Sequence, residues 1–386
     1  MCIRSYFPFF QNNPELIYLD SAATSQKPKC VIDSIAKYLE TVANPGRSDF
    51  GLSQEIENKI EKSRVNVANF FGTQSNNLAF TFGVTDGMNI VTNSLAKNII
   101  NYGDEILICD SDHKSTFLPW IELTKELKIV GKNIQIKKYL LDPFTGLINI
   151  KSLLANITER TRFVVLTHAH NVYGLVNSIS DITNLIPKNI ITVLDMAQTA
   201  GHIGIDFKEL NVGIVLFSGH KMFALEGVGG LIARDKVKDQ FKQVKFGGGE
   251  TNYFPYNLEI GTQNTVSILS LSSAVGFINS IGIENMHKEI ASLTRYLVLE
   301  LNKLNSIELM PGVGYDLKTQ NTGIVSFVPS YGIDKLKFLL SQSKINLRIG
   351  QHCTQELKDS VRVSLHAYNN IGDLDRLLAV LRNMEV

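Results

Sequence analysis

The sequence contains few cysteines, and they lie far apart. Its 386 residues include four of them, Cys2, Cys30, Cys109 and Cys353. Because no two are closely spaced, the pattern indicates neither a disulfide framework nor a zinc site. We therefore expect a reducing, cytoplasmic location, which leaves open whether any single thiol is reactive.

The chain also lacks a strong charge of either sign and any long apolar run. Its 38 Lys and Arg residues nearly balance its 37 Asp and Glu residues, so no overall field favours nucleic acid or an anionic membrane. No apolar run approaches the length of a membrane-spanning helix, and the cluster at residues 6–10 is too short and interrupted for a signal peptide. These absences predict a globular protein that binds neither nucleic acid nor a membrane.

Strand-like and helix-like segments alternate along most of the chain. The expected strands lie at residues 78–82, 105–109, 134–140, 162–167, 191–194, 214–217 and 229–233. Between most of them lies a segment long enough for a crossover helix, which predicts a mostly parallel seven-stranded sheet with helices on both faces. Only a short turn separates the last two, so we expect one strand to run antiparallel.

Helical patterns flank this sheet, and a smaller α/β unit follows it. The helices are expected at residues 30–39, 53–71 and 266–305, the last interrupted near Gly282. The C-terminal part is expected to form strand 323–328, helix 333–342, strands 345–349 and 361–365, and helix 373–384. We therefore expect a large domain over residues 16–260 and a small domain that combines residues 1–15 with 261–386.

A lysine follows one expected strand directly. The strand at residues 214–217 runs into Ser218-Gly219-His220-Lys221 with no turn spacer. Ligands of open α/β sheets bind outside the carboxyl ends of the strands, where a desolvated lysine amine can attack a carbonyl carbon. A lone lysine of this kind more often only ends a strand and faces water, so the neighbouring strand ends must decide.

Polar side chains follow other expected strands in the same way. The first strand ends in a glycine turn with Thr85, before a helical run expected from Met88, which is typical of a phosphate cradle or of an ordinary helix cap. His113 follows the second strand, where it would stack on a planar ligand or lie in solvent. Asp195 follows the apolar fifth strand, so we expect it to be buried and paired with a cation, or to cap a helix.

Two histidines after the fourth strand invite a metal site. His168 and His170 are spaced by two residues, which places both on one face of a strand. No carboxylate or cysteine is spaced to complete the ligand shell. We therefore predict no metal.

The polar strand ends are expected to meet, because a parallel sheet places its carboxyl ends at one edge. A phosphate cradle, a stacking histidine, a buried aspartate and a lysine nucleophile would then share one crevice. A cofactor with a phosphate, an aromatic ring with a basic nitrogen and an aldehyde satisfies all of these groups. The residues therefore predict pyridoxal 5'-phosphate as the cofactor.

Short motifs along the whole chain resemble one enzyme family, the class V aminotransferase-fold family, and within it the SUF-type (group II) cysteine desulfurases. The resemblance implies the pyridoxal-phosphate-dependent transferase fold of type I. The motifs occur in the family's order from end to end. They are Tyr18-Leu19-Asp20-Ser21-Ala22-Ala23-Thr24, Pro119-Trp120, Leu194-Asp195-x-x-Gln198, Phe217-Ser218-Gly219-His220-Lys221, Gly247-Gly248-Gly249-Glu250, Glu259-x-x-Thr262, Arg348-x-Gly350-x-His352-Cys353, Arg362-x-Ser364-Leu365 and Tyr368-Asn369.

The resemblance implies roles in cofactor binding and catalysis for matching residues. Lys221 would hold the cofactor covalently and move protons, and Asp195 would keep the pyridine nitrogen protonated. With Cys353 and His113, Lys221 would form the catalytic set. The other cofactor contacts are implied for His113 on the ring face, Gln198 on the ring oxygen, Thr85, Ser218 and His220 on the phosphate, and Thr262 reaching in from the second subunit of a homodimer.

The resemblance also implies how the substrate binds and reacts. Arg362 would pair bidentately with the carboxylate of L-cysteine, assisted by Asn171. Cys353 would attack the sulfur, keep it as a persulfide and release L-alanine. The persulfide would pass to an acceptor protein of the SUF system for iron–sulfur cluster assembly. Cys353 would otherwise be an inert small apolar residue, but its polar neighbours Gln351 and His352 argue against burial.

Some positions depart from the family pattern. They are Gln351 in place of a second histidine, a short span between Cys353 and Arg362, Ala224-Leu225-Glu226 in place of Gly-Pro-Thr, Asn257 in place of arginine, and Gly46 in place of the histidine before Arg47. One alternative is therefore a related enzyme: a selenocysteine lyase, a cysteine lyase or an aminotransferase. Another is a scaffold that binds a sulfur-transfer partner without catalysis.

Overall fold

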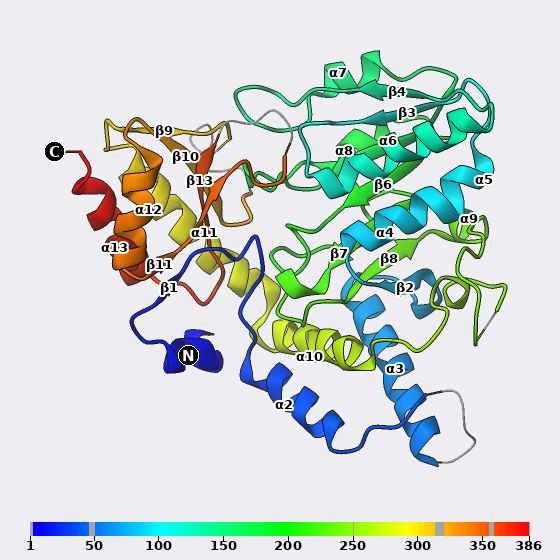
Figure 1. Cartoon of the computed structure of the whole chain (residues 1–386), viewed down its shortest axis with the longest axis horizontal. Helices are drawn as coiled ribbons and strands as arrows, with labels where there is room; N and C mark the ends of the chain where they lie inside the picture. Colours follow the sequence, from blue (N-terminus) through cyan, green and yellow to red (C-terminus); the bar gives the residue numbers. More distant parts are fainter. Residues whose placement is uncertain (1–2, 46–50, 250, 313–319, 355–358, 386) are drawn as a thin grey trace.

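A mostly parallel sheet forms the larger part of the molecule (Figure 1). The computed structural model describes residues 3–45, 51–249, 251–312, 320–354 and 359–385. Within these ranges the sheet has the seven strands expected, and their order is β2-β8-β7-β6-β5-β3-β4. They are β2 (Leu78–Thr81), β3 (Glu105–Ile108), β4 (Gln135–Lys138), β5 (Thr161–Thr167), β6 (Ile191–Asp195), β7 (Ile214–Ser218) and β8 (Gly229–Ala233). β8 runs antiparallel to both of its neighbours, which confirms the prediction of one antiparallel strand.

Helices cover both faces of this sheet (Figure 1). The helices of this part of the chain are α3 (Gly51–Phe70), α4 (Val84–Ile90), α5 (Lys97–Ile99), α6 (Lys114–Ile129), α7 (Ile150–Ala155), α8 (Ile179–Asn184), α9 (Asp235–Lys238) and α10 (Thr265–Ile281), with α2 (Lys29–Leu39) packed against α10. Alternate residues of β7 serve the two faces: Leu216 packs in the same cluster as Trp120 of α6, and Phe217 in the same cluster as Val67 of α3 and Ile268 of α10. The apolar run of β7 is therefore buried on both sides.

The helix after β2 starts earlier than the sequence pattern predicts. It was expected from Met88, but α4 begins at Val84. Gly83 makes this possible because its backbone has a φ of +128°, which other residues rarely adopt. The correction places Thr85 inside the first turn of the helix rather than in a loop before it.

A second, antiparallel sheet forms the smaller part, in the order β12-β13-β10-β9. Its strands are β9 (Ile307–Leu309), β10 (Ile324–Pro329), β12 (Arg348–Gly350) and β13 (Ser360–Ser364), and its helices are α11 (Ile283–Leu301), α12 (Ile333–Gln342) and α13 (Ile371–Arg382). The single strand expected at residues 345–349 is wrong. It is divided into β11 (Ile345–Asn346) and β12, because each half pairs with a different neighbour.

The N-terminal residues contact both parts of the molecule. α1 (Pro8–Asn12) precedes β1 (Ile17–Tyr18), which pairs in parallel with β11. Phe7 packs against Phe223, which follows β7, and against Tyr368, which follows β13. The expected domain limits, with the large domain at residues 16–260, stay a prediction. β1 belongs to the expected large domain but pairs with β11 of the small one. α10 belongs to the expected small domain but packs in the core of the large sheet.

Among the described residues, no single helix is both long and apolar enough to cross a membrane. The pair α10 and α11 passes that test only when it is joined across its 78° bend.

Candidate active site

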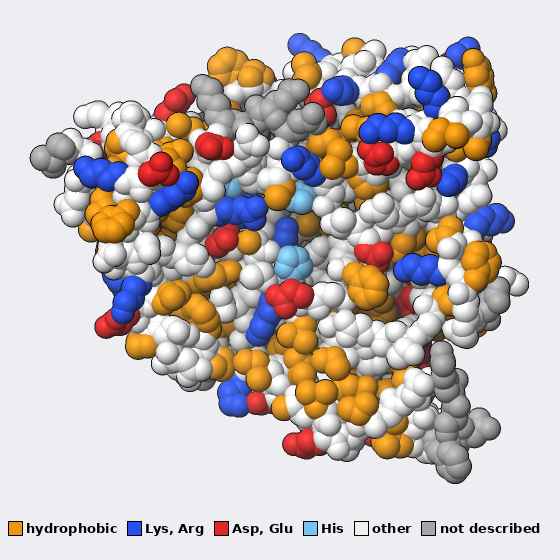
Figure 2. Space-filling view, viewed as in Figure 1, with side chains coloured by type: hydrophobic (Ala, Val, Ile, Leu, Met, Phe, Trp, Pro, Cys, Tyr) orange, Lys and Arg blue, Asp and Glu red, His pale blue; other side chains and the backbone are white. Residues whose placement is uncertain are grey.

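A cavity of about 210 Å³ opens at the carboxyl edge of the large sheet. Figure 2 shows a hollow on this face in which histidine and basic side chains gather. The cavity wall includes every predicted site residue except Cys353 and Thr262: Thr85, His113, Asn171, Asp195, Gln198, Ser218, His220, Lys221 and Arg362. A larger cleft of about 680 Å³ lies at the opposite, amino-terminal edge of the sheet and contains none of them. The expected convergence of the strand ends is therefore found.

Lys221 ends the short 3-10 turn η4 (Gly219–Lys221), which directly follows β7. The carbonyl before it, that of His220, accepts hydrogen bonds from the backbone N–H and the hydroxyl of Ser25, both at 3.0 Å. Burial lowers the pKa of Lys221 to about 8, although the charge of Asp195 opposes the shift. Roughly one amine in ten is then neutral at pH 7, which makes Lys221 a usable nucleophile and base.

Asp195 is the last residue of β6, and only 5% of it is exposed. Thr116 Oγ1 donates to its Oδ2 at 2.6 Å, and the backbone N–H of Ala197 donates to its Oδ1 at 2.8 Å. Burial raises the pKa of Asp195, and these two hydrogen bonds oppose the shift. A buried carboxylate held in this way is suited to pair with a protonated ring nitrogen.

His113 caps the N-terminus of α6, where its Nδ1 accepts a hydrogen bond from the backbone N–H of Ser115 at 3.2 Å. Burial, followed by the charge of Lys221, lowers the pKa of His113 to about 4. Burial likewise lowers the pKa of His220 to about 4. Both rings are therefore neutral at pH 7, and the flat, uncharged ring of His113 in the cavity wall can stack on an aromatic ligand.

Hydroxyl groups gather where α4 begins. Ser218 Oγ accepts a hydrogen bond from the N–H of Val84 at 2.9 Å, and Thr85 Oγ1 lies 2.7 Å from Ser115 Oγ. A Cβ atom at Gly83 would lie 3.1 Å from Ser218 Oγ, so the glycine allows a close approach of the two segments. The start of a helix and the hydroxyls of Thr85, Ser115 and Ser218 favour an anion, and this end of the cavity suits a phosphate.

Two predicted amide side chains contact other parts of the chain. Gln198 is buried, and its amide nitrogen donates to the carbonyl of Ala22 at 3.3 Å. The side chain of Asn171 donates to the carbonyl of His352 at 2.8 Å, and its own carbonyl accepts from Arg362 Nη1 at 3.1 Å. Asn171 thus holds the predicted substrate arginine through its backbone and the Cys353 loop through its side chain.

Arg362 lies in the middle of β13, and only 2% of it is exposed. Its Nη2 forms an ion pair with Asp20 Oδ1 at 3.0 Å, and its Nε is buried without a hydrogen-bond partner among the described residues. Arg348 of β12 is its direct partner across the strands, so two like charges face each other. Burial lowers the pKa of Arg362, and Asp20 opposes that shift. Such a donor is available to an ionised ligand.

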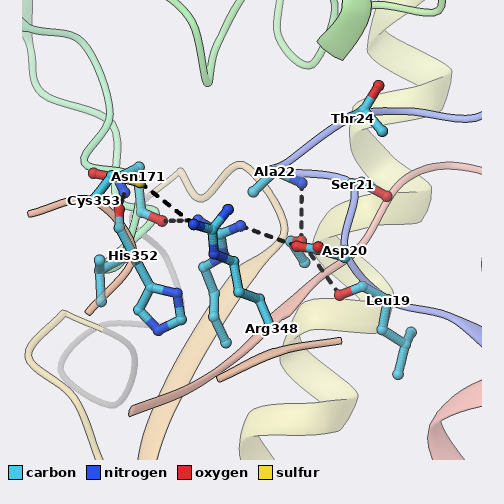
Figure 3. A network of polar contacts seen from close by, with 12 residues as sticks. Leu19, Asp20, Ser21, Ala22, Thr24, Asn171, Arg348, His352 and Cys353 are labelled. Atoms are coloured by element: carbon cyan, nitrogen blue, oxygen red, sulfur yellow. Dashed lines mark hydrogen bonds and ion pairs between the residues drawn. The ribbon is translucent and has the colours of Figure 1, made fainter. Parts of the chain in front are cut away.

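Cys353 is exposed, as predicted, and Arg348 Nη2 donates to its Sγ at 3.4 Å (Figure 3). His352 and Cys353 both have left-handed backbone angles, with φ values of +52° and +60°. This conformation is costly for residues other than glycine, so it persists only where contacts hold it. The N–H of Lys114 donates to the Cys353 carbonyl at 2.9 Å, and Ser360 Oγ lies 3.0 Å from His352 Nε2.

The structure does not bring Thr262 to the cavity. Thr262 is exposed and lines a separate cavity of about 80 Å³ with Phe82 and Asp86. It was expected to act in a second subunit, and that expectation stays a prediction. Other residues of the sequence motifs lie outside the described residues: Arg47, Glu250 and residues 355–358 of the short loop after Cys353.

The ring nitrogens of the two histidines after β5 contact protein groups. His168 Nδ1 lies 3.0 Å from Thr199 Oγ1, and His170 Nε2 lies 2.8 Å from the Ser111 carbonyl. In the described ranges, no group of three or more His, Cys, Asp or Glu residues could hold a metal ion.

Three residues at the site received no role from the sequence. Asp20 and Arg348 belong to the quoted motifs, but their contacts with Arg362 depend on chain segments that are distant in sequence. Thr116, which bonds Asp195, lies one turn into the helix that His113 caps. The sequence offers only one signal for Thr116, its position three residues after His113.

The aminotransferase class-V family model matches residues 17–377 of the chain. A cysteine desulfurase of Yersinia pestis (strain Pestoides F) is 29% identical over 407 residues, covering 99% of this chain and 97% of the relative. The apo structure of a cysteine desulfurase from Thermococcus onnurineus NA1 is 27% identical, with a TM-score of 0.90 over 99% of this chain and 97% of that chain.

The cysteine desulfurase CsdA from Escherichia coli has the same fold, with a TM-score of 0.87 at 24% identity over 98% of this chain and 96% of that chain. The family match extends over nearly the whole sequence and includes every residue that lines the cavity. The chain therefore belongs to the class-V aminotransferase family.

Proposed function

We propose that the protein is a pyridoxal 5'-phosphate-dependent cysteine desulfurase, which converts L-cysteine to L-alanine and keeps the sulfur as a persulfide on Cys353. One observation carries the proposal: Lys221 and Asp195 line the same cavity as Arg362, and Cys353 lies on an adjoining loop beside Arg348. Relatives that are similar over almost their entire length are named cysteine desulfurases, which supports it.

The cavity residues fit the proposed cofactor. The hydroxyls at the start of α4 suit its phosphate, the neutral ring of His113 suits its face, and buried Asp195 suits its ring nitrogen. When bound, pyridoxal phosphate supplies an aldehyde to which amines attach and a ring that withdraws electrons. Lys221 is the amine in the cavity that would hold it, and Gln198 and His220 would complete the contacts.

Each of the chain's own groups then has a defined task. Arg362 would bind the substrate carboxylate with its unpartnered Nε and with Nη2. Lys221, with a pKa of about 8, would take and return a proton near neutral pH. The Asn171 carbonyl would keep the guanidinium of Arg362 in place.

The proposed sulfur transfer needs no oxidant or reductant besides the Cys353 thiolate and the bound cysteine. Cys353 Sγ forms a bond with the sulfur of bound cysteine, and the carbon–sulfur bond of the substrate breaks. The electron pair of that bond stays with the carbon, which takes up a proton and leaves as the methyl group of alanine. Arg348, at 3.4 Å from Sγ, would steady the thiolate that carries out the attack.

Finer points of this function rest on the sequence resemblance. They are membership of the SUF-type subgroup, transfer of the persulfide to an acceptor protein for iron–sulfur cluster assembly, a cytoplasmic location, and a homodimer in which Thr262 contacts the phosphate of the partner's site. An exposed Cys353 supports transfer to another protein, because the thiol is open to solvent.

Incubation of the purified, cofactor-loaded protein with L-cysteine tests the proposal. We expect L-alanine and sulfide in equal amounts when a thiol reductant is present to release the persulfide. Pyruvate and ammonia instead of alanine would indicate a lyase, and a colourless protein that binds no pyridoxal phosphate would indicate a scaffold. Either result would overturn the proposal.

A further inference from the structure

Residues 19–22 lie beside the end of β13, and we call them the strap (Figure 3). Their backbone forms hydrogen bonds with Ser364, the last residue of that strand. The N–H of Ser364 donates to the Leu19 carbonyl at 2.8 Å, and the N–H of Ser21 donates to the Ser364 carbonyl at 3.2 Å. The N–H of Ala22 donates to Ser364 Oγ at 2.9 Å. The strap is therefore built into the small sheet, two residues beyond Arg362.

The strap places a carboxylate on the arginine that the proposed function reserves for the substrate. Asp20 Oδ1 lies 3.0 Å from Arg362 Nη2, with 17% of the Asp20 side chain exposed and 3% of the Arg362 side chain. The Asn171 carbonyl accepts from Nη1, which leaves Nε as the nitrogen without a partner in the described chain. An internal anion thus already occupies part of the guanidinium.

The charge of Asp20 has two consequences at this place. Arg348 stands directly opposite Arg362 across the strands, so Asp20 offsets a repulsion between like charges and keeps Arg362 in position. A second carboxylate that binds Arg362 must also come close to Asp20, and two carboxylates that share one guanidinium repel each other in a largely buried site. Asp20 therefore orients Arg362 and weakens the binding of a carboxylate ligand to it.

We propose that Asp20 is a positioning residue that also acts as a built-in competitor, which keeps the affinity of the site for amino-acid carboxylates low and so favours the release of alanine. The inference rests on the proposed function, because it takes Arg362 as the carboxylate site. If the charge of Asp20 is removed, the inference predicts tighter binding of the ligand's carboxylate. It also predicts slower turnover, because a misplaced Arg362 binds the substrate in a poorer geometry.

The test compares two amines in the cofactor-loaded protein, by calorimetry and by the visible absorbance of the cofactor. L-alanine carries the carboxylate, and cysteamine has an amine and a thiol but no carboxylate. In Asp20→Asn, which keeps the shape of the side chain, we expect the Kd for alanine to fall about tenfold and the Kd for cysteamine to stay within twofold. In the same variant, kcat for cysteine should fall. Asp20→Glu keeps the charge, so its Kd for alanine and its kcat should both lie closer to the wild-type values.

Asp33→Asn is the matched control, because Asp33 is exposed and pairs with Lys29 on the surface of α2; it should change neither Kd. Weaker or unchanged alanine binding in Asp20→Asn contradicts the competition, and a parallel weakening of both amines with a lower Tm reduces Asp20 to a structural role. A wild type that binds no alanine overturns the inference, since Arg362 is then no carboxylate site. A wild type that binds alanine but makes none from cysteine overturns the proposed function and leaves the Asp20 comparison valid.

Discussion

The two sides of the cavity are built by different means. On the cofactor side, Lys221, Asp195 and the hydroxyls near α4 follow neighbouring strands of the large sheet, and hydrogen bonds fix most of them. On the sulfur side, Arg362 lies within an antiparallel strand, while a strap and a loop with left-handed residues add Asp20 and Cys353. The cofactor side is preformed, whereas the sulfur side holds an opposed charge, an unpartnered donor and local backbone strain.

The difference suggests a division of tasks within one reaction. A rigid cofactor side keeps the chemistry of the amine constant, and a strained sulfur side can adjust as substrate enters and persulfide leaves. Variants of the two sides should therefore fail in different ways, which the following predictions use, from the largest expected effect to the smallest.

Lys221→Ala should stop turnover, with a loss of at least about 10³-fold, because no other lysine lines the cavity among the described residues. Alanine production from cysteine measures this. Lys97→Ala is a control, since Lys97 pairs with Glu126 on the surface. Turnover of Lys221→Ala near the wild-type rate would mean that the cofactor side is not where the amine reacts.

Cys353→Ser should lose about 10²-fold or more of its alanine production while it keeps the visible spectrum and the alanine affinity of the wild type. The reason is that the thiol takes part in sulfur transfer only. Cys30→Ser controls for the loss of an exposed thiol elsewhere. Full turnover in Cys353→Ser would favour the lyase or aminotransferase alternative and would end the division between the two sides.

Thr116→Val should slow turnover by about 10- to 100-fold, since it leaves a buried carboxylate oxygen without its donor at 2.6 Å. Loss of the bond raises the pKa of Asp195 further, so the variant should also hold pyridoxal phosphate more weakly. Thr124→Val, in the same helix, removes a hydroxyl that donates to the Ile121 carbonyl of that helix, and it should have little effect. Equal effects of the two variants would contradict the role assigned to Thr116.

Acid should destabilise the cofactor-free protein through its buried histidines. Burial lowers the pKa of His168 to about 4, so between pH 6.5 and 4 the unfolded chain binds more protons than the folded one, and stability falls as the pH falls. Denaturant unfolding at pH 6.5 and pH 5 should show that His168→Asn loses about 1.5 kcal/mol less than the wild type over this interval. An identical loss in both proteins would show that His168 is not buried in the neutral form.

The sequence predicts the convergence of the strand ends on the cofactor side, because the carboxyl ends of parallel strands meet at one edge of a sheet. The strands leading to Thr85, His113, Asp195 and Lys221 are all present, and the residues meet in one cavity. α4 begins four residues earlier than predicted, because the apolar pattern does not reveal the positive φ angle of Gly83.

The sulfur side was predicted only in part. The motifs assign roles to Arg362 and Cys353, but the facing pair of arginines depends on the strand register between β12 and β13, which no periodicity reveals. The same holds for the strap, because residue 20 and residue 362 meet through tertiary contacts alone. The division of residues 345–349 into two strands arises from two different pairing partners, β1 and β13.

Mass spectrometry of the cofactor-loaded protein after a brief exposure to L-cysteine tests the central claim most directly. The account predicts one additional sulfur atom on the peptide that contains Cys353, removable by a reductant, and none on the peptide that contains Cys30. Alanine formation without a sulfur adduct on Cys353, or an adduct of equal yield on Cys30, would contradict it.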